Sequence, residues 1–251
     1  MSYLDYKKYT KGMKSLLVYV KPTHRPIPPT INKTLKVQID NCLDLGWARE
    51  DIILATNFTF QHNNVKAYIL QETCEYAPFF NKQYAIAELM LEGILDRPVF
   101  YHDLDAYQVI PFEFPSFEGD FAACLYPKFI EGTLLCGTMY LKLSSIDMIV
   151  DLVTKMKQRI FNSIDDEQVI RYYFKNNPQY SKRVSILDSS WNMGLSSFVT
   201  RYEQAKLPIK VLHFHPEIDK HWEIMVEGKN EINVCLLDPR LNKLMKKYQL
   251  R

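Results

Sequence analysis

The chain has 251 residues, of which 47% are hydrophobic and 13% aromatic, which suits a large compact domain with a substantial core. Its 31 lysines and arginines nearly balance 29 aspartates and glutamates, so no strong overall field attracts nucleic acid, although a local basic patch is compatible with this balance. With only eight glycines, and with neither a Gly-x-Gly-x-x-Gly fingerprint nor a Gly-Lys-Ser/Thr loop, the sequence argues against a glycine-rich phosphate site.

The N-terminus and the cysteines indicate where the protein works. The first residues lack the apolar core of a signal peptide, and no apolar run approaches the length that spans a membrane. The cysteines are odd in number and have no Cys-x-x-Cys spacing, which predicts reduced thiols and neither a disulfide framework nor a zinc knuckle. We therefore expect a cytoplasmic protein. The five cysteines are Cys42, Cys74, Cys124, Cys136 and Cys235.

Strands and helices are predicted to alternate through the first half of the chain. A buried strand is expected at 15–20, followed by a loop over Lys21–Thr30, which contains four prolines. Apolar residues at helical spacing predict helices over 31–45 and 79–95. The expected strands between and after these helices are 51–56, 65–70 and the run that begins at Val99.

The second half of the chain continues the pattern with shorter elements. Strands are expected at 121–125, 137–143, 184–187 and 210–214, and helices at 145–160 and 165–175. This order predicts an α/β fold in which helices flank a mixed, mostly parallel central sheet. We expect one domain over 1–251, with a core of about 15–222 and a helical tail over 223–251.

The end of the tail, Asp238–Arg251, is basic and amphipathic. Leucines, a methionine and a tyrosine alternate with lysines and arginines at helical spacing. Two interpretations are open. The helix packs on the domain, which we favour because its apolar stripe is short, or it docks on an anionic surface such as a membrane or nucleic acid.

Residues 99–105 carry the strongest functional signal. An apolar run ends in Asp103 and Asp105, which are two residues apart and therefore share one face of a strand. Two carboxylates at the end of a strand can bind one hard divalent cation that also holds substrate phosphates. Ligands of open α/β sheets bind at this end of the strands. The alternative is a pair of solvated turn residues.

Several short motifs follow the acidic pair in a characteristic order. They are Gly132–Met139 with Gly137, Asp165-Asp166-Glu167-Gln168, Ser190-Trp191-Asn192, His213-Phe214-His215-Pro216 and Lys220-His221-Trp222. This series resembles the GT-A glycosyltransferases, most closely the family 8 group of glycogenin and the lipopolysaccharide galactosyltransferases. The resemblance spans roughly residues 15–222.

The resemblance implies a GT-A fold and a metal-dependent transfer of sugar from a nucleotide sugar, with a UDP-sugar as donor and retention of the anomeric configuration. It implies that Asp103, Asp105 and His213 hold Mn²⁺ or Mg²⁺. It places Asp166, Glu167 and Asn192 beside the reacting sugar or the acceptor. The remaining donor contacts that it implies are Tyr19 and Val20 at the base, Thr56 and Asn57 at the nucleoside, Lys82 at a phosphate, Gly137 under the sugar and Lys220 on the leaving diphosphate.

The motifs depart from the family at several positions. Glu167 stands where glutamine is expected, so a base or nucleophile role, and with it inversion, stays open. Cys136 stands where asparagine or serine is common, and His102 replaces an apolar residue. Pro216 and His221 replace a glycine and a proline, and Lys220 falls one residue late.

Each residue of the site also has a purely structural interpretation. His213 fits a buried strand histidine and Lys220 a solvated lysine, while Asp166 fits a capping box with Ser163. Asn192 fits an amide that satisfies a loop, and Gly137 a strand bulge. The acceptor half of the site carries no motif, so a glycan, a glycolipid, another hydroxyl or a modified nucleic-acid base would suit it.

Three other functions compete with glycosyl transfer. A catalytically inactive sugar-nucleotide-binding protein would carry the same fold. Haloacid-dehalogenase-type phosphatases also use Asp-x-Asp, but near the N-terminus and before threonine or valine, whereas Ala106 and Tyr107 follow here. Sugar nucleotidyltransferases need a glycine-rich basic loop, and Lys21–Pro29 contains no glycine.

Overall fold

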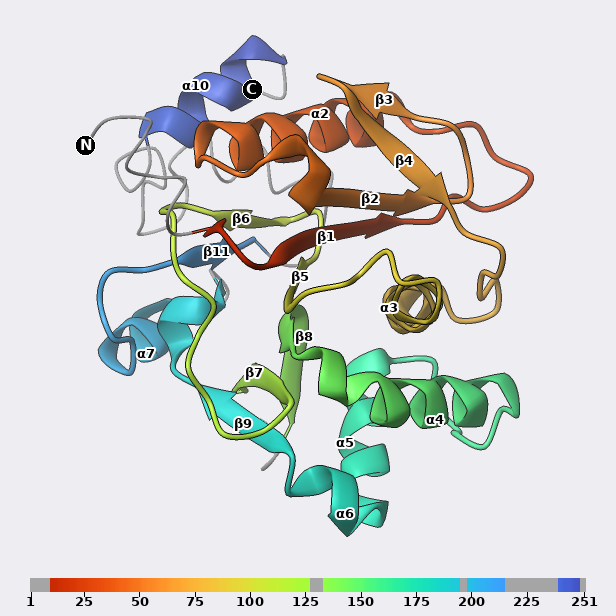
Figure 1. The fold of residues 1–251 in the computed structure, drawn as a ribbon. Coiled ribbons are helices and arrows are strands. Elements are labelled where there is room, and N and C mark those ends of the chain that lie inside the picture. Colours follow the sequence, from red (N-terminus) through yellow and green to blue (C-terminus); the bar gives the residue numbers. More distant parts are fainter. Residues whose placement is uncertain (1–9, 127–132, 195–197, 215–238, 249–251) are drawn as a thin grey trace.

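The computed structural model describes residues 10–126, 133–194, 198–214 and 239–248 (Figure 1). An eight-stranded sheet forms the centre of the molecule. Its spatial order is β3 (Gln61–His62), β4 (Val65–Ile69), β2 (Ile52–Thr56), β1 (Lys14–Tyr19), β5 (Val99–His102), β8 (Leu134–Leu141), β7 (Phe121–Leu125) and β9 (Val184–Leu187).

The middle of this sheet is parallel. β1 pairs in parallel with both β2 and β5, and β2 pairs in parallel with β4. β8 runs antiparallel to β5 and β7, and β3 runs antiparallel to β4. The prediction of a mixed, mostly parallel α/β sheet is confirmed. A second, three-stranded sheet lies beside the first and joins β10 (Met193–Gly194), β11 (Val211–His213) and β6 (Ala106–Gln108).

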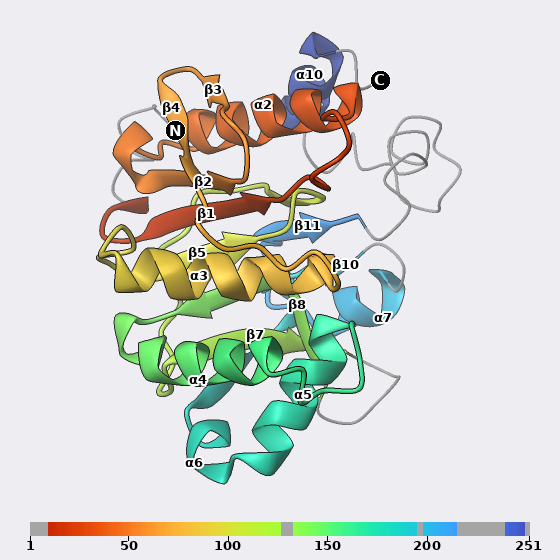
Figure 2. The same ribbon diagram turned by 90° about the vertical axis from the view of Figure 1, so that its right-hand side faces the viewer.

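Helices cover both faces of the large sheet. α3 (Asn81–Leu91) and α4 (Ile146–Lys157) cross one face, and α2 (Pro29–Asp44) lies on the other (Figures 1 and 2). α5 (Asp166–Asn176) packs beside β8 and is followed by the single turn of α6 (Pro178–Ser181). α7 (Phe198–Glu203) adjoins the small sheet, and α10 (Pro239–Lys247) follows at the C-terminal end.

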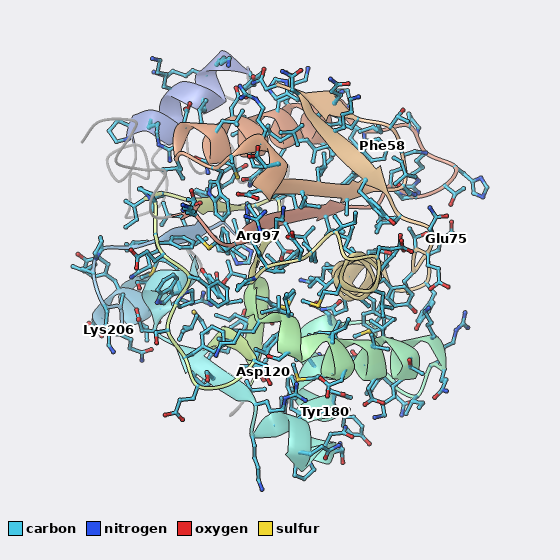
Figure 3. All side chains as sticks on the ribbon, viewed as in Figure 1. Phe58, Glu75, Arg97, Asp120, Tyr180 and Lys206 are labelled. Atoms are coloured by element: carbon cyan, nitrogen blue, oxygen red, sulfur yellow. The ribbon has the colours of Figure 1, made fainter. Side chains whose placement is uncertain are left out.

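The alternation of side chains along β1 builds two apolar cores. Leu16 and Leu17 are both fully buried, but they point to opposite faces of the strand. Leu16 packs with the apolar residues of α3, α4 and α5, whereas Leu17 packs with those of α2. Figure 3 shows the side chains that fill the space between the sheet and its helices.

The predicted elements agree with the structure to within a few residues at most ends. The helix expected over 79–95 is shorter and ends at Leu91, because Gly93 takes a positive φ of 71°. The strand expected at 137–143 begins earlier, at Leu134. β3, β6, β10, α6 and α7 were not predicted, since two to six residues are too few to show a periodic pattern.

The C-terminal helix packs on the domain, as the favoured interpretation of the tail expects. The Asp40 carboxylate of α2 accepts hydrogen bonds from Lys247 Nζ at 2.7 Å and from the Tyr248 hydroxyl at 2.6 Å. Arg240 donates to the side chain of Asn41 on the same helix. Among the described residues, no helix is both long and apolar enough to span a bilayer.

We predict that Leu17→Ala lowers the free energy of unfolding by about 2–5 kcal/mol, because it leaves a cavity under α2. Leu91 is 66% exposed at the end of α3, so Leu91→Ala should change the unfolding free energy by no more than about 0.5 kcal/mol. Urea unfolding followed by circular dichroism measures both variants. Equal losses would contradict the two-core description.

Candidate active site

The carboxyl ends of β1 and β5 and the first turns of α3 and α5 meet around one cleft. Its volume is about 700 Å³. The described residues that line it are Val18, Tyr19, Val20, Ile31, Pro78, Phe79, Asn81, Lys82, Tyr101, Asp103, Leu104, Asp105, Tyr126, Ile164, Asp165, Asp166, Glu167 and His213. The cleft therefore lies where ligands of open α/β sheets bind.

The acidic pair lies in a turn and not in the strand itself. β5 ends at His102, and the amide of Ala106 donates back to the carbonyl of Asp103 at 3.0 Å. The Asp103 amide in turn donates to the carbonyl of Gly137 at 2.8 Å. The two carboxylates thus converge because a tight turn holds them. From the sequence we expected them to converge because they share one face of a strand.

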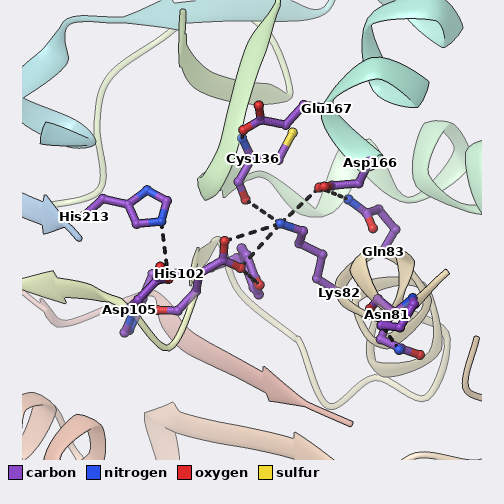
Figure 4. A network of polar contacts seen from close by, with 12 residues as sticks. Asn81, Lys82, Gln83, His102, Asp105, Cys136, Asp166, Glu167 and His213 are labelled. Atoms are coloured by element: carbon purple, nitrogen blue, oxygen red, sulfur yellow. Dashed lines mark hydrogen bonds and ion pairs between the residues drawn. The ribbon is translucent and has the colours of Figure 1, made fainter. Parts of the chain in front are cut away.

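β11 brings His213 to the acidic pair. β11 pairs antiparallel with β6 so that His213 stands opposite Ala106, immediately after Asp105. His213 Nε2 lies 3.3 Å from Asp105 Oδ1 (Figure 4). One ligand atom from each of Asp103, Asp105 and His213 lies within 4.8 Å of the others.

Two neighbours fix the imidazole of His213. Its Nδ1 lies 3.0 Å from Asn192 Oδ1, an acceptor, so in the neutral ring this contact favours the tautomer with the proton on Nδ1 and the lone pair on Nε2. A Cβ atom on Gly137 would lie 1.9 Å from His213 Cε1, so only glycine leaves room for the ring. One imidazole nitrogen and two carboxylates within 4.8 Å of one another are a ligand set that fits a divalent metal.

Both Asn192 and Gly137 lie against His213. Asn192 is completely buried and is not among the described residues that line the cleft, and its amide oxygen contacts the ring. The His213 ring also fills the space where a side chain at position 137 would lie. The expected contacts of Asn192 and Gly137 with a sugar or an acceptor stay predictions.

Lys82 links the acidic pair to α5. Its ammonium lies 3.4 Å from Asp103 Oδ1 and 3.0 Å from Asp166 Oδ2, and it donates to the Cys136 carbonyl at 3.2 Å (Figure 4). Burial alone would lower the pKa of Lys82, but the carboxylates of Asp103 and Asp166 raise it well above its ordinary value. Lys82 is therefore a fixed cation in the wall of the cleft.

The start of α5 contributes Asp166 and Glu167. Asp165 caps this helix and accepts hydrogen bonds from the amides of Glu167 at 3.0 Å and Gln168 at 3.4 Å. The alternative interpretation of Asp166 as part of a capping box with Ser163 is therefore wrong. Because Asp165 does the capping, the Asp166 carboxylate is available to Lys82.

The pKa values of both carboxyl groups at the start of α5 are raised. Burial raises the pKa of Asp166 in spite of its pairing with Lys82. Burial, and secondarily the charge of Asp166, raises the pKa of Glu167 to about 7. Glu167 Oε1 accepts the amide hydrogen of Cys136 at 3.1 Å, which holds the side chain against β8.

The remaining predicted donor contacts divide into three groups. Tyr19 and Val20 line the cleft, as expected. Thr56 and Asn57 are not among its lining residues, because β1 separates β2 from β5, and Asn57 instead binds the backbone of Lys21 through its amide nitrogen at 2.8 Å and its amide oxygen at 3.0 Å. Lys220 falls outside the described residues.

Sequence analysis missed Tyr101. Its hydroxyl donates to Asp103 Oδ1 and its side chain lines the cleft. The signal was present in the sequence, because Tyr101 precedes Asp103 by two residues at the end of the same apolar run.

Comparisons with known proteins identify the fold. No family model matches the chain, and no curated protein matches it. Among solved structures, an active-site mutant of LgtC in which glutamate replaces glutamine matches with a TM-score of 0.56 and 12% identity, over 94% of this chain and 96% of that chain. The galactosyltransferase LgtC in complex with donor and acceptor sugar analogues matches with a TM-score of 0.54 and 11% identity, over 94% and 96%.

A third match is a glycosyltransferase involved in glycosylation of the major capsid of PBCV-1. Its TM-score is 0.55 and its identity 12%, over 83% of this chain and 97% of that chain. This chain has the fold of these glycosyltransferases. The fold that the sequence motifs implied is therefore confirmed.

The raised pKa of Glu167 makes a prediction about stability. Between pH 4.5 and about 7 the folded state keeps this proton while the unfolded state loses it, so ionisation of Glu167 lowers the free energy of unfolding as the pH rises. Glutamine does not ionise, so the free energy of unfolding of Glu167→Gln should not show this decrease. The difference in unfolding free energy between Glu167→Gln and the natural protein should therefore rise by up to about 3 kcal/mol from pH 4.5 to pH 8. Urea unfolding at a series of pH values measures the difference, and a difference that does not vary with pH would contradict the assignment.

Proposed function

We propose that the protein is a metal-dependent glycosyltransferase that moves a sugar from a UDP-sugar to an acceptor hydroxyl. The observation that carries the proposal is the convergence of Asp103, Asp105 and His213 at one cleft of a glycosyltransferase fold. Two carboxylates and an imidazole suit Mn²⁺ better than Mg²⁺. The donor diphosphate would complete the coordination of the ion.

The residues around the cleft divide the work of binding the donor. Tyr19 and Val20 at the end of β1 flank the base. Lys82 would face the diphosphate, and a divalent ion held by Asp103, Asp105 and His213 would supply the Lewis-acid chemistry that stabilises the departing nucleoside diphosphate. Asp166 lies 3.0 Å from Lys82, and its carboxylate would accept hydrogen bonds from hydroxyls of the donor sugar.

Glu167 lies next to Asp166 at the sugar end of the cleft. With a pKa of about 7, it takes up or releases a proton near neutral pH, which suits a group that receives the proton of the acceptor hydroxyl. The family resemblance favours retention of the anomeric configuration, whereas a base role for Glu167 keeps inversion open. A catalytically inactive sugar-nucleotide-binding protein would have the same cleft. Only a measurement of turnover distinguishes it from an active glycosyltransferase.

Asp105→Asn should abolish the Mn²⁺-stimulated release of UDP from a UDP-sugar, because it removes one of two carboxylate ligands. UDP release is measured with a panel of UDP-sugars, with and without Mn²⁺, first with water and then with hydroxyl acceptors. Loss of a metal ligand should lower the rate at least about 100-fold.

Asp96→Asn is the matched control, because Asp96 precedes the opposite end of the same β5 strand and is exposed. This variant should keep the natural rate. Unchanged UDP release in Asp105→Asn would refute the metal site. Stabilisation of the natural protein by UDP and Mn²⁺ without turnover on any donor would favour the inactive binder.

Asn192→Leu should weaken Mn²⁺ binding by about 10-fold to 100-fold, because the His213 ring loses the acceptor that fixes its tautomer. Electron paramagnetic resonance of free Mn²⁺ measures the affinity, and the thermal midpoint reports whether the variant is folded. Natural affinity in a folded Asn192→Leu protein would show that the amide does not position His213.

A further inference from the structure

Apolar residues from two parts of the chain line the cleft together with its polar residues. The polar residues, which we call the polar floor, are the acidic pair, His213, Lys82 and the start of α5. One apolar part lies at the end of β1, with Tyr19 and Val20, and is assigned above to the base. The other is formed by the segment that precedes α3 and by the residue that precedes the cap of α5, and it includes Phe79 and Ile164.

Phe79 and Ile164 are exposed apolar side chains that line the cleft. Phe79 is 62% exposed and Ile164 is 57% exposed, although both line the cleft. Large apolar side chains left open at the rim of a functional cleft indicate a surface that a ligand covers. Ile164 is set apart from the end of β1, because α5, which Ile164 precedes, packs beside β8, and β5 separates β8 from β1. Phe79 precedes α3, which packs against β1, so it lies closer to the part assigned to the base.

Neighbouring residues anchor the backbone at both positions. Phe80, next to Phe79, is buried in the core and packs edge-on against Tyr76 with ring centroids 6.0 Å apart. Ile164 lies between Ser163 and Asp165, and the Ser163 hydroxyl accepts the Asp165 amide hydrogen at 3.1 Å. We call the exposed side chains of Phe79 and Ile164 the apolar rim.

Both rim residues lie close in the chain to polar residues of the cleft. Phe79 precedes Lys82 by three residues, and Ile164 precedes Asp166 by two. The 3.0 Å ion pair between Lys82 and Asp166 therefore joins the two helix starts beside which the rim residues lie. If a molecule covers the rim, the part of it that enters the cleft would lie beside Asp166 and Glu167, where the proposed function places the transfer of the sugar.

We propose that Phe79 and Ile164 select the acceptor, and that the acceptor carries its hydroxyl on a unit joined to an apolar group. This inference rests on the proposed function and names the substrate class of the same site. The hydroxyl-bearing unit enters the polar floor beside Glu167, and the apolar group covers Phe79 and Ile164. Covering the rim also keeps water from the departing sugar, which favours transfer over hydrolysis.

The test compares acceptors that differ only in the apolar group. Glucose, galactose and N-acetylglucosamine are each offered free, as the hexyl glycoside and as the phenyl glycoside, with the UDP-sugar that gives the highest UDP release. We expect kcat/KM for at least one sugar to rise about tenfold with an apolar aglycone. A preference for hexyl indicates an aliphatic carrier, and a preference for phenyl indicates an aromatic one.

Phe79→Ser and Ile164→Ser should each reduce this aglycone preference to less than about threefold. Leu91→Ser is the matched control, because Leu91 is 66% exposed at the far end of α3 and is not among the residues that line the cleft, and it should keep the full preference. Since all three side chains are exposed, the variants should fold, and their thermal midpoints check this.

The outcomes separate the two proposals. No UDP release from any donor would refute the proposed function itself. UDP release with equal turnover of free sugars and glycosides, or with no turnover of any acceptor in the panel, would refute the acceptor inference alone. A preference that survives in both serine variants would also refute it.

Discussion

The buried ammonium of Lys82 is the interaction on which the candidate site depends. It lies between the carboxylates of Asp103 and Asp166 and also binds the Cys136 carbonyl, so it connects the turn after β5 with α5 and β8. Two carboxylates that lie beside the same ammonium would repel each other if this cation were removed. Without the Lys82 charge, the buried Asp166 would have no cation beside it among the described contacts, and such a loss typically costs about 3–5 kcal/mol.

The second constraint is the short pairing of β6 with β11. It places His213 beside Asp105, although the two residues are far apart in the chain. Parallel pairing of β10 with β11 sets Gly194 beside His213 and so brings Asn192 close to the same ring. Gly137 on β8 leaves the space that the ring fills. The imidazole is thus held from three elements, which is the preorganisation that a metal ligand requires.

Much of the large sheet could be predicted from the sequence, because long apolar runs and helical spacing record which face of each element is buried. The acidic pair and His213 were also found, the first from spacing and the second from a motif. The convergence of these residues could not be predicted from pattern alone. The strand that carries His213 was predicted, but β6, with which it pairs, has only three residues and shows no periodicity, and a pattern does not say which strands pair.

The differences between the expected and the observed positions have similarly local causes. Ser163 and Asp165 both offer an oxygen where α5 begins, and sequence spacing does not decide which of them caps the helix. Thr56 ends β2 as Tyr19 ends β1, but the spatial order of the strands puts β2 one position farther from the acidic pair. Asn192 lies close to the site because its amide contacts His213.

The central claim is that Asp103, Asp105 and His213 bind one divalent ion that faces the donor diphosphate. Crystallography with UDP and Mn²⁺, with anomalous data collected at the manganese edge, tests it most directly. The account predicts one anomalous peak about 2.0–2.4 Å from an oxygen of each aspartate and from His213 Nε2. A manganese peak elsewhere, or UDP bound in the cleft with no metal at these three residues, would contradict it.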